Sequence, residues 1–162
     1  MQVIGSATEA DMIGAFRDAE PERWARRGYP NERIFTGFPT DCVWERVALT
    51  DTELRELRHI RHEPTWLKIA GPFRKPEVAA EWVRRHPEDE TAKSVRAIQS
   101  RLAAGETLPP IILVALPSRT ELVVMEGNKR VVAAVVGDAS ASDFRFLLGT
   151  SPAMHNWYFF KD

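Results

Sequence analysis

The stretch ELVVMEGNKRVVAAVV, residues 121–136, decides how the second half of the chain folds. An apolar run stops at Glu126, turns through Gly127 and Asn128, and restarts after two cations, Lys129 and Arg130. Gly-Asn is a known two-residue hairpin turn and valine favours strands, so one interpretation is a β-hairpin. The other interpretation is a strand that leads into a helix, whose first turn would carry both cations.

The strand-to-helix interpretation predicts an anion-binding site. Two cations at a helix N-terminus oppose the helix macrodipole, at about 0.3–1 kcal/mol each, whereas the unpaired N–H groups of the first turn favour an anion. Gly127 would let a ligand approach the backbone, and Asn128 would cap the helix or contact a phosphate oxygen. Glu126 would hold Mg²⁺ or accept a proton. The residues alone do not choose between the hairpin and the anion site.

The rest of the chain predicts a mixed α/β (α+β) fold. Capping signals and apolar spacing predict four helices, over residues 7–18, 51–61, 76–86 and 89–104. β-Branched apolar runs predict three strands, over residues 109–116, 121–125 and 143–150. The stretch from Pro21 to Thr40 has no sustained period and is expected to be irregular. The aromatic segment SPAMHNWYFF, residues 151–160, is expected to pack in the core or at the sheet edge, with an oligomer contact or a lid over the ligand as the alternatives.

Composition excludes several classes of function. The formal net charge of −1 supplies no basic footprint for direct nucleic-acid binding. Cys42 is the only cysteine, so neither an internal disulfide nor a thiolate metal cluster is expected, and a cytoplasmic location fits. No apolar run approaches the roughly 18 residues that would span a membrane. His59 and His62 share a metal-like spacing without a third ligand, so exposed or salt-bridged histidines are expected.

From about residue 89 to residue 150, the order of features resembles the ParB/sulfiredoxin-like superfamily. These features are a helix, a strand that begins at Pro109-Pro110, a second strand, and the motif Gly127-x-x-Arg130. The resemblance implies a small mixed sheet with helices, in which the motif opens a helix and binds nucleotide phosphates. It implies a nucleotide-binding core over residues 76–162, with residues 1–75 as a helical or irregular extension packed on it.

The sulfiredoxin branch suggests ligand contacts on the helix before the Pro-Pro strand. Its ATP-contacting Lys, Ser and Thr correspond by position to Lys93, Arg96 and Ser100 here. Its nucleophilic Cys corresponds to Asn128, which cannot form a thiolate, so reduction of sulfinic acids is not expected. The ParB branch implies CTP in place of ATP, but no counterpart of its DNA-reading helices is expected after residue 130.

The free-serine kinase branch of the superfamily places an acidic residue before its Gly-x-x-Arg motif. Glu126 matches that acid, which implies a role as a catalytic residue or metal ligand. A second acid of these kinases lies on the entering helix, where Glu88, Asp89 and Glu90 are candidates, and Glu90 is taken as the second catalytic residue.

The resemblance therefore implies binding of ATP or CTP with Mg²⁺ by Lys93, Arg96, Ser100 and the Gly127–Arg130 motif. One outcome is phosphoryl transfer to a small-molecule substrate. The alternative is a non-catalytic nucleotide-sensing or protein-interaction module that works with a DNA-binding partner. A homodimer is compatible with either function.

Overall fold

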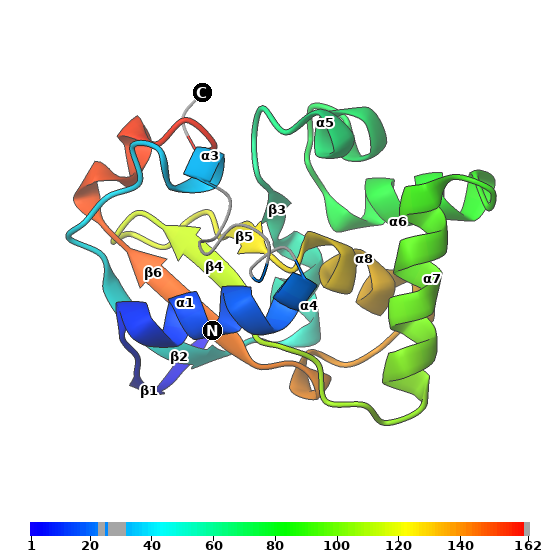
Figure 1. The fold of residues 1–162 in the computed structure, drawn as a ribbon, viewed down its shortest axis with the longest axis horizontal. Helices are drawn as coiled ribbons and strands as arrows, with labels where there is room; N and C mark the ends of the chain where they lie inside the picture. Colours follow the sequence, from blue (N-terminus) through cyan, green and yellow to red (C-terminus); the bar gives the residue numbers. More distant parts are fainter. Residues whose placement is uncertain (23–24, 26–31, 161–162) are drawn as a thin grey trace.

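A mixed six-stranded sheet runs through the protein, as Figure 1 shows for the computed structural model, which describes residues 1–22, 25 and 32–160. The strand order is β1-β2-β6-β4-β5-β3. The β4–β6 and β3–β5 pairs are parallel, and the other neighbours are antiparallel. The strands are β1 Gln2–Ser6, β2 Val43–Ala48, β3 Arg58–His59, β4 Ile111–Ala115, β5 Val123–Glu126 and β6 Phe146–Thr150.

The predicted mixed α/β class is confirmed, and the three predicted strands correspond to β4, β5 and β6. The strands β1, β2 and β3 were not predicted. They come from residues 1–75, which were expected to be helical or irregular, and they belong to the same sheet as the later strands.

The helices are α1 Glu9–Ala19, α3 Glu32–Phe35, α4 Asp51–Glu56, α5 Pro64–Ala70, α6 Pro76–Arg85, α7 Glu90–Ala103 and α8 Asn128–Gly137. The predictions that correspond to α1, α6 and α7 are confirmed, including the caps at Thr8 and Asp89. The helix α5 was not predicted, although its start carries two signals: Glu63 accepts a hydrogen bond from the Trp66 N–H, and Pro64 is the first helical residue. The stretch expected to be irregular contains α3 and lies partly outside the described residues.

The prediction of a single helix over residues 51–61 is wrong. The capping box at Thr50 forms, but α4 ends at Glu56, and Leu57 is extended with ψ 157°. The apolar residues of this segment do not share one face, because Leu54 and Leu57 pack on one side of the sheet whereas Ile60 packs on the other. The chain therefore leaves the helix and continues as β3, which forms one edge of the sheet.

The core lies on both faces of the sheet. Ile111 and Leu113 of β4 point into one apolar cluster and Ile112 into the other, which explains why β4 reads as a continuous apolar run. Figure 1 shows α1 in front of the sheet, and α6, α7 and α8 grouped beside β5. The predicted core packing of the aromatic tail is confirmed for Trp157 and Phe159, which are buried, and the Trp157 indole N–H donates to the Ile34 carbonyl, whereas Tyr158 is exposed. Among the described helices, none has the length and apolar character needed to cross a membrane.

Candidate functional site

The decisive stretch forms a strand-to-helix turn, and the hairpin interpretation is wrong. The strand β5 ends at Glu126, Gly127 adopts the left-handed conformation with φ 98° and ψ 14°, and α8 begins at Asn128. A hairpin would need a free edge of β5. That edge does not exist, because β4 pairs with one side of β5 and β3 with the other.

Gly127 is required here for its conformation and for its lack of a side chain. A Cβ at this position would lie 3.0 Å from both the Arg130 Nη2 and the Ile111 Cγ1 atoms. The guanidinium of Arg130 therefore lies directly against the backbone of the turn. The positive φ is a conformation that residues other than glycine rarely adopt.

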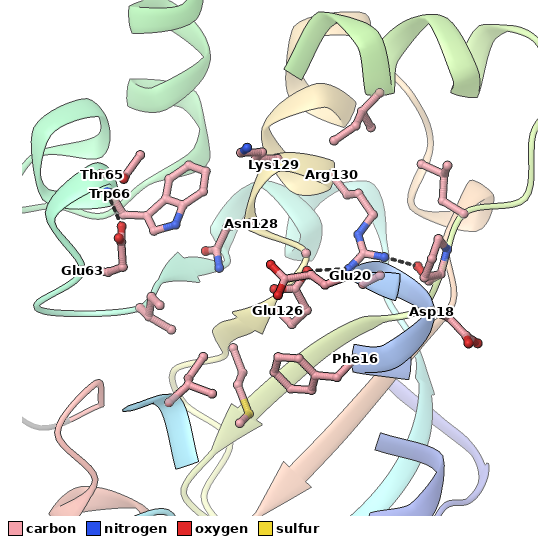
Figure 2. Close-up of a pocket in the computed structure, with 18 of the residues that line it drawn as sticks. Phe16, Asp18, Glu20, Glu63, Thr65, Trp66, Glu126, Asn128, Lys129 and Arg130 are labelled. Carbon is pink, nitrogen blue, oxygen red and sulfur yellow. Dashed lines mark hydrogen bonds and ion pairs between the residues drawn. The ribbon is translucent and has the colours of Figure 1, made fainter. Parts of the chain in front are cut away.

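A cavity of about 550 Å³ opens beside this turn. Its walls come from the end of α1, the start of α5, the C-terminal half of α7 and the start of α8, as Figure 2 shows for most of these residues. Among the described residues, four carboxylates line it: Asp18, Glu20, Glu63 and Glu126. Three cations of the same described part line it as well: Arg101, Lys129 and Arg130. Charged groups of both signs therefore line the cavity, and Glu126, Lys129 and Arg130 belong to the turn that opens α8.

Arg130 is the buried cation of the cavity. Its side chain is fixed by a 2.7 Å hydrogen bond from Nη1 to the Pro109 carbonyl and by a 3.1 Å ion pair from Nη2 to Glu126 Oε1. Burial lowers the pKa of Arg130 from its ordinary value, while the charges of Glu126 and Glu20 raise it. An arginine nevertheless stays protonated, so the cavity wall carries a fixed positive charge at all relevant pH values.

The side chain of Asn128 is used by the fold. Its Nδ2 donates to the Val124 carbonyl at 3.1 Å, and its Oδ1 lies 2.7 Å from Nδ1 of His59. The expectation that Asn128 orients phosphates with its side chain is therefore not supported, although its backbone begins α8. The expectation that His59 is exposed or salt-bridged is wrong, because His59 is fully buried.

The structure does not bring Lys93, Arg96 and Ser100 to this cavity. Lys93 pairs with Glu90 at 3.0 Å, and Arg96 and Ser100 line a separate open depression. The predicted catalytic residue Glu90 is also absent from the cavity wall, and its side chain is exposed at the start of α7.

Arg101 and Ile98 are the residues by which α7 contributes to the cavity. They are three positions apart and share a helix face that differs from the face of Lys93 and Ser100. The Nε of Arg101 donates to Glu106 Oε2 at 2.7 Å, and its Nη2 contacts the other oxygen of that carboxylate. The resemblance implied ligand contacts from Lys93, Arg96 and Ser100 of α7, whereas the residues of α7 that line the cavity are Ile98 and Arg101.

Five residues near the cavity escaped the sequence analysis as site residues: Glu20, His59, Glu63, Trp66 and Arg101. Glu20 caps the end of α1, Glu63 caps the start of α5, and the other three lie in β3, α5 and α7, all far from the Gly127 motif in sequence. Only the capping role of Glu63 had a local signal. Within the part of the chain that the structure describes, no three His, Cys, Asp or Glu side chains are grouped as a protein-only metal site requires.

Comparison with known proteins adds no family. No family model matches the chain, and neither the curated proteins nor the solved structures include a match. The resemblance to the ParB/sulfiredoxin-like superfamily stays a prediction, and the function is argued from the cavity itself.

Proposed function

We propose that the cavity binds the phosphate groups of a nucleotide, ATP or CTP, at the N-terminus of α8. The observation that carries this proposal is Arg130, which is only 5% exposed yet lines the cavity beside the first turn of the helix. A guanidinium has five donors in a planar fork that matches phosphate oxygens. Two of its nitrogens already contact Pro109 and Glu126, which holds the group in one orientation for a ligand.

Three further groups support an anion at the same place. The first-turn N–H groups of α8 have no acceptor within the helix, and they point toward its N-terminal end. Lys129 is exposed at the cavity, and Arg101 approaches from α7. Surface ion pairs such as Arg101–Glu106 contribute about 0–1 kcal/mol, so a phosphate can compete with Glu106 for this arginine.

The carboxylates fit a Mg²⁺ ion that accompanies the nucleotide. Glu126 and Glu20 both line the cavity, and both raise the pKa of Arg130 through their charges. Mg²⁺ in nucleotide sites is usually held by one or two carboxylates together with the phosphates, so three protein ligands are not needed. Glu126, with Glu20, would hold the ion, whose charge would offset the repulsion between these carboxylates and the phosphates. Catalysis would then depend mostly on positioning the phosphates and the acceptor, and Glu126 would also be placed to accept a proton.

Isothermal titration with ATP, ADP and CTP, each with and without Mg²⁺, tests the binding. We expect Lys129→Ala and Arg101→Ala each to weaken binding about 3- to 10-fold, because each removes one charge from the cavity. Lys93→Ala and Arg96→Ala are matched controls, since they remove the same charges from α7 outside the cavity. Absence of binding in the wild type, or equal losses in the controls, would contradict the proposed site.

Turnover separates phosphoryl transfer from the non-catalytic alternative. Incubation with nucleotide, Mg²⁺ and a pool of small metabolites is expected to consume nucleotide in the wild type. Glu126→Gln should abolish this consumption, because the amide preserves the size of the side chain but cannot accept the proton. Nucleotide binding by this variant is compared without Mg²⁺, where it should be retained, since Glu126 is also the proposed Mg²⁺ ligand. Glu90→Gln is the control, because Glu90 does not line the cavity. Binding without turnover in the wild type would favour the nucleotide-sensing module.

The proposal includes a cytoplasmic location, which rests on the single cysteine, Cys42, and on the nucleotide itself. It includes no direct contact with nucleic acid.

A further inference from the structure

One buried ring, His59, contacts two walls of the cavity. It stacks on the indole of Trp66, which lies on α5, with 4.4 Å between ring centroids and 12° between ring planes. Its Nδ1 lies 2.7 Å from Oδ1 of Asn128, the first residue of α8. Trp66 and Asn128 both line the cavity, whereas His59 does not. The ring therefore connects Trp66 on α5 with the N-terminus of α8, where phosphate is proposed to bind.

The hydrogen bonds determine where the proton of His59 lies. The amide nitrogen of Asn128 donates to the Val124 carbonyl, so the amide oxygen faces the ring and must accept. Nδ1 consequently carries the proton, and Nε2 is an unprotonated acceptor. Nε2 is buried and has no hydrogen-bond partner among the described residues. Burial lowers the pKa of His59 to about 4, with a smaller lowering by the Arg74 charge and an opposing effect of Asn128.

The backbone of His59 is anchored to the sheet and to a second buried side chain. Its N–H donates to the Arg74 carbonyl, and Arg74 Nη1 donates back to the His59 carbonyl at 2.9 Å. Arg74 is 5% exposed and forms a 2.6 Å ion pair with Glu121. His59 also pairs in register with Val124 of β5, two residues before that strand ends at Glu126. These contacts hold the backbone of His59, and the ring attached to it, in a defined position relative to the turn at Gly127.

We propose that His59 is a positioning residue for the anion site: its neutral ring fixes the first turn of α8 relative to the Trp66 wall. This inference rests on the proposed function, because it assigns His59 a role in nucleotide affinity without contact to the nucleotide. Small displacements of groups that bind a ligand cost affinity, so supporting residues matter even when they lie behind the site.

His59→Phe is the test variant, because phenylalanine keeps the stack on Trp66 and removes the Nδ1–H donor. His86→Phe is the matched control, since His86 stacks on Trp82 with the same 4.4 Å spacing and a 15° angle, outside the cavity. In titrations with ATP and Mg²⁺, we expect about tenfold weaker binding for His59→Phe and a change within twofold for His86→Phe. Asn128→Ala should cause a smaller loss of affinity in the His59→Phe background than in the wild type, because both changes break the His59–Asn128 link, although Asn128→Ala also removes the bond to the Val124 carbonyl.

A measurement without ligand separates this inference from the proposed function. The Val131 N–H donates to the Gly127 carbonyl and closes the first turn of α8, so its hydrogen exchange reports on that turn. Exchange should be about tenfold faster in His59→Phe and unchanged in His86→Phe. If the wild type binds no nucleotide, the proposed function fails, while the exchange result still decides the positioning role.

The wild-type protein supplies a readout that does not depend on the folding of a variant. Imidazole ¹⁵N shifts should show His59 as the neutral Nδ1–H tautomer at neutral pH. The Nε2–H tautomer, or a charged ring at neutral pH, would overturn the inference. Wild-type affinity and wild-type Val131 exchange in a folded His59→Phe variant would overturn it as well.

Discussion

Gly127→Ala is expected to lower the free energy of unfolding by about 2–5 kcal/mol, as measured by urea denaturation. A left-handed conformation costs an L-residue about 1–2 kcal/mol, and crowding in a packed site adds about 1–3 kcal/mol. The crowding has a specific origin, because the new Cβ would lie 3.0 Å from Ile111 Cγ1 in the buried strand β4 and 3.0 Å from Arg130 Nη2. Arg130 would have to shift by a few tenths of an ångström, which would strain its contacts with Pro109 and Glu126. Nucleotide affinity should fall with it.

Gly105→Ala is the matched control for this substitution. Gly105 follows α7 with φ 76°, also positive, and an added Cβ there would meet no atom within 4 Å. The free energy of unfolding of this variant should therefore fall only by the cost of the left-handed backbone conformation, about 1–2 kcal/mol. The variant should bind nucleotide normally. Equal losses of stability in the two variants would contradict the crowding argument. Unchanged nucleotide affinity in a folded Gly127→Ala protein would contradict the role assigned to Arg130.

The second large effect is a loss of stability between pH 7 and pH 5 caused by His59. Its pKa is about 4 in the folded protein, against an ordinary value near 6.5 in the unfolded chain. The unfolded chain therefore takes up a proton on this residue first as the pH falls, and folding loses stability from about pH 6.5 down to about pH 4. Linkage gives a loss of about 2 kcal/mol by pH 5. Denaturant titrations at the two pH values measure it.

The variant His59→Phe should lack this part of the pH dependence, and His86→Phe should retain it. Carboxylates do not obscure the comparison in this interval. Hydrogen bonds from the Thr91 N–H and from Arg101 hold the pKa values of Asp89 and Glu106 below their ordinary values, so their contributions disappear only at lower pH. Identical pH profiles for the wild type and His59→Phe would show that the buried ring does not remain neutral.

The turn at Gly127 illustrates how far local sequence information extended. Valine propensity and the Gly-Asn pair favoured a hairpin, and the cations were compatible with either structure. The structure forms a helix because both edges of β5 are already paired and because Val131, Val132 and Val135 of α8 are buried. The burial of Val131 and Val132 outweighs the small helix penalty of valine, about 0.5 kcal/mol per residue. Neither cause can be seen within the stretch itself.

The helix α7 illustrates the same limit for the site. Its bounds, its Asp89 cap and its buried Val95 follow from local spacing and are confirmed. Which polar face meets a ligand depends on how the helix packs against α8 and the sheet, so the cavity receives Arg101 and not Lys93.

The sequence by itself determined the apolar strands β4, β5 and β6, the caps of α1 and α7, and the presence of a carboxylate, a glycine and an arginine at one turn. These features depend on neighbours within a few residues, where spacing and capping chemistry act. Only the tertiary structure decided that the turn opens a helix, that β3 continues from α4, and that Glu20, Trp66 and Arg101 share a cavity with Arg130. Such contacts join segments far apart in the chain, and their energy depends on burial, which local spacing does not encode.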